Sequence, residues 1–189
     1  MRELFSAYIA VLTLAVIGIA QNPGPKYRDS IRSSCLDSSF LSISAHTLRH
    51  DGFPDVELRL TDPKGHVTGN GSRENEIPNS QYGQIVEIPQ HPTLSKAVAV
   101  EVCQAVQGRY AFTVTEHGGS QYRITVRGND GKDGNESQVL SFQAHGDRTC
   151  QYRFYFLMAE GKVSIRWLDT NDHPLPFLER PECEAVPRT

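Results

Sequence analysis

Apolar and polar residues alternate with a repeat of two along much of this chain. Residues 56–61 read Val-Glu-Leu-Arg-Leu-Thr, and a similar alternation returns at 98–102, 110–114 and 122–126. Successive side chains of a β-strand point to opposite faces, so this pattern is typical of strands with one buried face. No segment shows a sustained helical period. We therefore expect an all-β fold, an antiparallel β-sandwich of Ig-like or jelly-roll-like type in a single domain.

Turn residues stand between these runs. The segment 62–65, Asp-Pro-Lys-Gly, follows the first run, and its Pro presets φ at the second position of a tight turn that Gly closes. A Gly-Gly pair at 118–119 stands between 110–114 and 122–126. It predicts a hairpin that joins these two strands.

The second half of the chain continues the same pattern. A loop at 128–134 precedes a short strand expected at 138–143, and a closing hairpin is expected from 152–156 and 163–167. The segment before Cys35 and the tail after Asp169 are expected to be coil.

The first residues indicate export. Arg2 precedes an apolar stretch at 7–20 that is short for a bilayer span and ends in Gly-Ile-Ala, small residues of the kind that a signal peptidase requires. We expect residues 1–20 to be a cleaved secretory signal, with an uncleaved anchor or a lipoprotein signal as the alternative. No membrane span is expected in the mature chain. The protein would be secreted, periplasmic or displayed at the cell surface.

The expected organisation follows from these boundaries. Residues 21–34 form a flexible N-terminal segment, 35–168 the sandwich domain, and 169–189 a C-terminal tail. The formal net charge is -3, with 22% charged residues. Because there is no basic excess to attract polyanions, we expect no nucleic-acid partner.

Four cysteines form an even set, and export predicts two disulfides. A hairpin over 151–168 brings its ends together, so the following coil can return Cys183 to Cys150. By elimination, Cys35 would pair with Cys103, and four cysteines formally allow three connectivities. No two cysteines have the C-x-x-C spacing of a zinc site, and no cofactor is expected.

Two stretches resemble known families. The run Thr61 to Gly65, then Gly69 and Glu76 to Tyr82, is similar to a pattern in uncharacterised exported bacterial proteins. The strands at 108–114 and 121–127 resemble the core of bacterial pre-peptidase C-terminal-like domains. This resemblance implies a β-sandwich that acts as a non-catalytic accessory module.

Catalytic motifs are weak. The run 117–120, His-Gly-Gly-Ser, resembles a lipase oxyanion loop, but the chain has no G-x-S-x-G elbow. His46, His50 and Asp51 could supply metal ligands, yet solvated histidines are the expected state on a strand or loop. A secreted hydrolase using Ser72 or Ser120 is the remaining enzymatic alternative.

Calcium is the best inorganic candidate. Asp169, Asn171 and Asp172 resemble the D-x-N-D linker of cadherin repeats, and the alternative is a turn capped by these side chains. The loop at 129–134 fails the EF-hand template, because Leu140 stands at its twelfth position.

Carbohydrate binding would require exposed aromatic faces. Trp167 and Tyr155 are the candidate platform residues, although Trp167 keeps phase with the expected core. Glycosylation sequons occur at Asn70 and Asn135. The function expected from the sequence is a non-catalytic accessory or protein-interaction module of unknown partner, and a carbohydrate-binding module is the alternative.

Overall fold

Strands make up the regular structure in the part of the chain that the structure, a computed structural model, describes. The described residues are 35, 38–48, 52–71, 76–87, 95–119, 121–131, 138–145, 148–159, 162–176, 179 and 181–186. The expected signal at 1–20 and the segment 21–34 lie outside them. The strands are β1 (Phe40–Thr47), β2 (Val56–Thr61), β3 (Val67–Gly69), β4 (Ser80–Glu87), β5 (Ser95–Cys103), β6 (Gly108–Glu116), β7 (Gln121–Asn129), β8 (Gln138–His145), β9 (Thr149–Ala159), β10 (Lys162–Leu168) and β11 (Glu184–Ala185).

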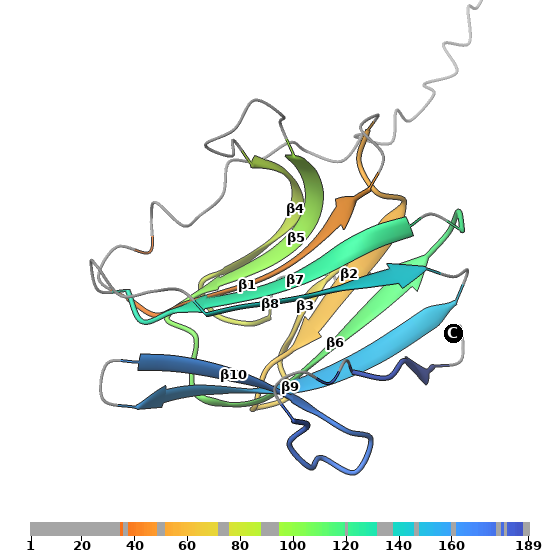
Figure 1. Cartoon of the computed structure of the whole chain (residues 1–189). Coiled ribbons are helices and arrows are strands. Elements are labelled where there is room, and N and C mark those ends of the chain that lie inside the picture. The colour runs from red at the N-terminus through yellow and green to blue at the C-terminus, as the bar shows by residue number, and fades with distance from the viewer. Residues whose placement is uncertain are drawn as a thin grey trace, which may run out of the picture.

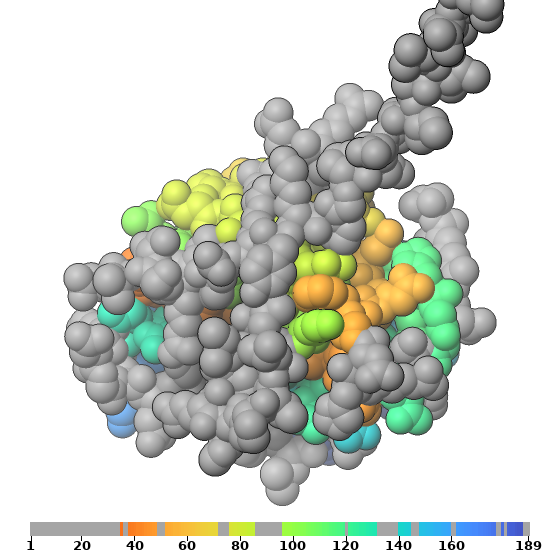
Figure 2. Space-filling model, turned by 90° about the horizontal axis from the view of Figure 1, so that it is seen from above, coloured from red at the N-terminus to blue at the C-terminus, as the bar shows by residue number. Residues whose placement is uncertain are grey.

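Two antiparallel sheets pack face to face (Figure 1). One has five strands in the order β4-β5-β1-β7-β8, and the other has the order β10-β9-β6-β2-β3 with β11 beside β9. The five-stranded sheet is uppermost in Figure 1. Figure 2 looks down on that side and shows β4, in yellow-green, at the surface. The expected antiparallel β-sandwich is therefore confirmed.

The core lies between the sheets and is rich in aromatic rings. Tyr110 and Phe112 of β6 lie beside Phe154 and Tyr152 of the neighbouring strand β9 on the inner face of the six-stranded sheet, with ring centroids 5.5 and 5.1 Å apart for the two pairs. All four side chains are buried. Such rings bury large apolar areas, and their removal from water stabilises the contact between the two sheets.

The prediction of a hairpin between β6 and β7 is wrong. β6 pairs with β2 and β9 in the six-stranded sheet, whereas β7 pairs with β1 and β8 in the five-stranded sheet. Both strands are central, so neither has a free edge for the other. The glycines at 118–119 therefore carry the chain from one sheet to the other.

Four strands stand where none was expected: β1, β3, β4 and β11, the last of them in the tail that was expected to be coil. In β1, Leu41, Ile43 and Ala45 are buried and alternate with Ser42 and Ser44. The alternation is present in the sequence, but the small serines weaken its contrast. β4 carries Gly83 and is an edge strand paired only with β5 among the described residues.

The turn expected at 62–65 is confirmed, and it joins β2 to β3 in a hairpin. Gly65 has φ 88°, and its N–H donates to the Asp62 carbonyl at 3.0 Å. The Asp62 carboxylate accepts hydrogen bonds from the N–H groups of Lys64 and His66, both at 2.8 Å.

Both expected disulfides are present. Cys35 is bonded to Cys103 at the end of β5, and Cys150 to Cys183, with Cα–Cα distances of 5.4 and 5.0 Å. The second disulfide is supported by pairing of β11 with β9, in which Ala185 lies opposite Cys150. The C-terminal tail is thus tied back to the six-stranded sheet. Between 35 and 186, the described segments contain no helix of the length and apolar character that a membrane span requires.

Candidate binding site

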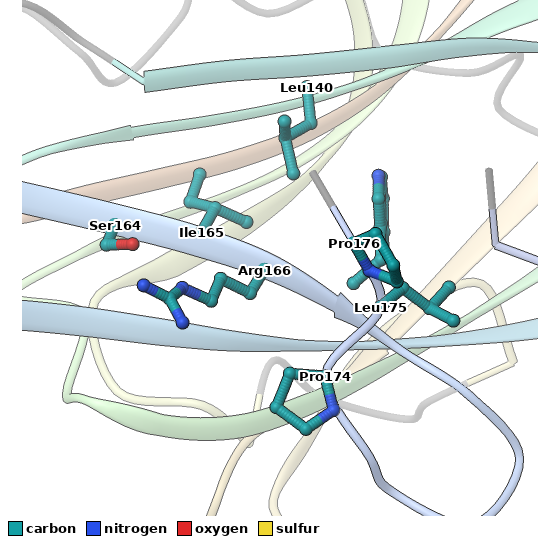
Figure 3. Close-up of a pocket in the computed structure, with 8 residues that line it drawn as sticks. Leu140, Ser164, Ile165, Arg166, Pro174, Leu175 and Pro176 are labelled. Atoms are coloured by element: carbon teal, nitrogen blue, oxygen red, sulfur yellow. The ribbon is translucent and has the colours of Figure 1, made fainter. Parts of the chain in front are cut away.

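The strands β8 and β10 end their respective sheets on the same side of the sandwich. A cavity of about 510 Å³ opens beside them, which we call the edge cleft (Figure 3). The described residues that line it are Leu140, Ser164, Ile165, Arg166, Trp167, Pro174, Leu175 and Pro176. Pockets of this size are typical of ligand-binding sites in proteins.

Core residues form the floor of the edge cleft. Leu140 comes from β8, and Ile165 and Trp167 come from the inner face of β10. The Trp167 ring contacts Phe142 and Phe154, with centroid distances of 5.5 and 6.0 Å. The indole thus packs against other rings, and this part of the floor is apolar.

Polar side chains form the outer lip. Ser164 and Arg166 alternate with Ile165 and Trp167, so they lie on the outer face of β10. In Figure 3 the Arg166 side chain runs along the strand toward Ser164. Arg166 is exposed and forms no ion pair with another described residue.

A row of side chains continues from Arg166 across the outer face of the six-stranded sheet. Arg166 lies opposite Tyr155 of β9, and Tyr155 lies opposite Arg109 of β6. Tyr155 is 36% exposed. The outer face therefore presents an aromatic ring between two guanidinium groups.

The turn after β10 builds the remaining wall. The Asp169 carboxylate accepts N–H groups of Asn171 and His173, each at 2.8 Å. These bonds, first the one from His173, lower the pKa of Asp169 below its usual 3.8. The chain then doubles back, and the N–H of Leu175 donates to the Trp167 carbonyl at 2.8 Å. This return places Leu175 and its neighbouring prolines against the cleft.

Asp172 ties the same turn to the outer face of the sheet. It has φ 64°, which L-residues seldom adopt, and its carboxylate pairs with Arg109. The other carboxylate oxygen lies 3.9 Å from Nε of Arg153, whose Nη2 lies 2.6 Å from Glu184. Two arginines of the sheet thus hold the turn and the C-terminal strand.

The three candidate calcium ligands lie in the turn after β10. Asp169 caps it, Asp172 pairs with arginine, and Asn171 contributes its backbone N–H to Asp169. Across the described ranges, no group of three or more His, Cys, Asp or Glu is arranged to hold a metal ion. Calcium binding here stays a prediction from the sequence.

The aromatic candidates are not brought together. Trp167 faces the core and is 6% exposed, whereas Tyr155 stands on the outer face. They lie on opposite faces of one sheet and do not share a platform. The sequon residue Asn70 is exposed in the turn after β3, and Asn135 lies outside the described residues.

Of the candidate catalytic and metal-ligating residues, the structure describes His46 and His117. His117 is exposed and its Nε2 lies 3.3 Å from Glu57, while His50, Asp51, Ser72 and Ser120 lie outside the described residues. His46 is hydrogen-bonded to Oγ of Ser44 at 2.7 Å. Ser44 is 3% exposed, so a substrate cannot approach its hydroxyl in this conformation.

A second cavity, of about 180 Å³, was missed by the sequence reasoning. Glu116, 1% exposed, lines it together with Tyr122 and Tyr152, beside the Cys150–Cys183 disulfide. Burial raises the pKa of both phenols, and the nearby Glu116 raises it further. The signal was available, because Glu116 continues the inward-facing phase of β6.

No family model, curated protein or solved structure matches the chain. The resemblance to exported bacterial sandwich domains therefore stays a prediction.

Proposed function

We propose that this chain is an exported, non-catalytic β-sandwich module that binds a partner protein through the edge cleft. It would act in a secreted form, in a periplasm or at a cell surface. The two disulfides support an oxidising compartment, because such bonds persist there.

One observation carries the proposal: a cavity of about 510 Å³ whose apolar floor includes Trp167 and whose lip carries the exposed Arg166. Binding sites are commonly concave and mostly apolar, with a few polar groups that orient the ligand. Buried aromatic anchors and arginines also dominate the energetics of protein interfaces. The edge cleft has an apolar floor and, in Arg166, an exposed arginine at its lip.

The test is selection of a random peptide library against the purified, disulfide-bonded protein. Ser164→Trp places a bulky ring at the outer lip, and Gln121→Trp adds the same ring at an exposed site on β7. We expect enriched peptides to bind the wild type and Gln121→Trp but not Ser164→Trp. Absence of enrichment, or equal binding by both variants, would show that the cleft is not a protein-binding site.

A glycan array run on the same samples tests the carbohydrate alternative. Saturable glycan binding that is lost in Tyr155→Ala would replace the proposed function. Tyr155 is the exposed member of the two aromatic candidates, so this substitution leaves the core intact.

A further inference from the structure

We propose that the edge cleft recognises an extended acidic segment of the partner protein. A bulky apolar side chain of that segment would enter the cleft, and its carboxylates would lie against the outer face of β10. This inference rests on the proposed function and specifies the partner's chemistry.

The apolar anchor follows from the floor of the cleft. Leu140, Ile165 and Trp167 are buried, and Leu175 and two prolines form the opposite wall. An aromatic or branched side chain that enters the cleft would be removed from water wherever it contacts these groups. Apart from the Trp167 indole N–H, the polar side chains among the described lining residues are Ser164 and Arg166, which stand at the lip.

The acidic character follows from the outward side chains of β10. These are Lys162, Ser164 and Arg166, with no acidic residue among them. Neither cation forms an ion pair with another described residue, whereas Arg109 and Arg153 hold Asp172. The chain as a whole has a net charge of -3, so the outer face of β10 carries positive charge in a protein whose net charge is negative. A guanidinium favours the planar geometry of a carboxylate.

The spacing of the two cations favours an extended chain over a small acid. Lys162 and Arg166 are four residues apart on one face of a strand, which is about 13 Å at roughly 3.3 Å per residue. An extended segment can place one carboxylate beside each of these positions. A segment that runs alongside β10 would match them with acidic residues at i and i+4, and its apolar anchor at an odd offset would point inward.

The composition of the selected peptides is the first measurement. We expect Asp or Glu at i and i+4, with an aromatic or branched residue between them at an odd offset. A synthetic peptide of this type, labelled for fluorescence anisotropy, is then compared with its Asn/Gln counterpart.

Charge reversal provides the matched control. Arg166→Glu should weaken binding of the acidic peptide by about tenfold or more, since charge-assisted hydrogen bonds are lost. Arg123→Glu makes the same change at an exposed position on the outer face of β7 and should leave binding unchanged. Arg166→Glu should in turn bind better to a peptide in which Lys replaces the acids.

Different results would contradict the acidic partner and the proposed function. Peptides that are blocked by Ser164→Trp but show no acidic preference, or bind Arg166→Glu as well as Arg123→Glu, would overturn the acidic partner and leave the proposed function standing. If no peptide depends on the cleft, the proposed function fails and this inference fails with it.

Discussion

Gly65 is the residue at which backbone conformation most directly limits the choice of side chain in the 62–65 turn. Its φ is 88°, and an added Cβ would meet no atom within 4 Å. Any penalty for a larger residue therefore comes from the left-handed backbone and not from a clash. A β-branched residue is the least compatible with this conformation.

We expect Gly65→Val to lower the free energy of unfolding by about 1–2 kcal/mol. Gly65→Asn should lower it less, because Asn tolerates the left-handed region. Urea unfolding of both variants measures the difference. Equal losses for Val and Asn would show that the turn does not require this φ in solution.

Residues of the candidate site were predictable to different degrees. Trp167 was expected in the core from its phase with 163 and 165, and it is buried there. Arg166 was not predicted as a site residue, because one exposed arginine in an alternating strand is ordinary. Its significance depends on the turn at 169–176 folding back beside it, which the coil-like sequence of that turn does not predict.

At the scale of elements, the alternating pattern predicted the positions of the strands better than it predicted which strands pair with each other. The closing pair β9 and β10 is the expected hairpin, and β7 and β8 also pair directly. The β6–β7 loop has equally good hairpin residues but crosses between the sheets. A short glycine loop is compatible with both paths, and the choice depends on which distant strands occupy the edges of β6 and β7.

Gly128 of β7 is a point of close approach between the two sheets. An added Cβ would lie 2.8 Å from Phe156 and from Val163, and 3.0 Å from Ile165. Only a residue without a side chain lets β10 approach β7 this closely. The position of Ile165, a floor residue of the edge cleft, therefore depends on this glycine.

We expect Gly128→Ala to lower the free energy of unfolding by about 1–3 kcal/mol through overpacking. Val163→Ala removes one of the clashing groups. The double variant should therefore be more stable than the sum of the two single losses predicts. Strict additivity in chemical denaturation would show that the two sheets do not meet at this position.

The whole molecule is a two-sheet core with a disulfide bonded to each sheet. Cys103 ends β5 of the five-stranded sheet, and Cys150 lies in β9 of the six-stranded sheet. Cross-links of this kind stabilise the fold by restricting the unfolded chain. The hairpin expected at 151–168 favoured one of the three possible connectivities, and the structure has that one.

Buried tyrosines make the stability of the whole molecule sensitive to alkaline pH. Tyr82 is partly buried, and its desolvation, with a contribution from Glu57, raises its pKa from 10.0 to about 12. Burial also raises the pKa of Tyr110, Tyr122 and Tyr152. The fold therefore favours the neutral phenol at each of these positions.

The sign of the pH effect follows from proton linkage. Below pH 10 both folded and unfolded tyrosines are protonated, and the stabilisation is fully present. Above pH 10 the unfolded side chains ionise first, so each buried tyrosine lowers the free energy of unfolding by about 1.4 kcal/mol per pH unit until its folded pKa is reached.

We expect the melting temperature to fall steeply between pH 10 and 12, with tyrosinate absorbance rising together with loss of near-ultraviolet circular dichroism. Tyr82→Phe removes one ionising group and should make this fall shallower, although the variant loses the hydrogen bond of its phenol to the backbone of Leu58. A melting temperature that is constant across this range, or tyrosines that ionise before the fold is lost, would contradict the buried arrangement of these rings.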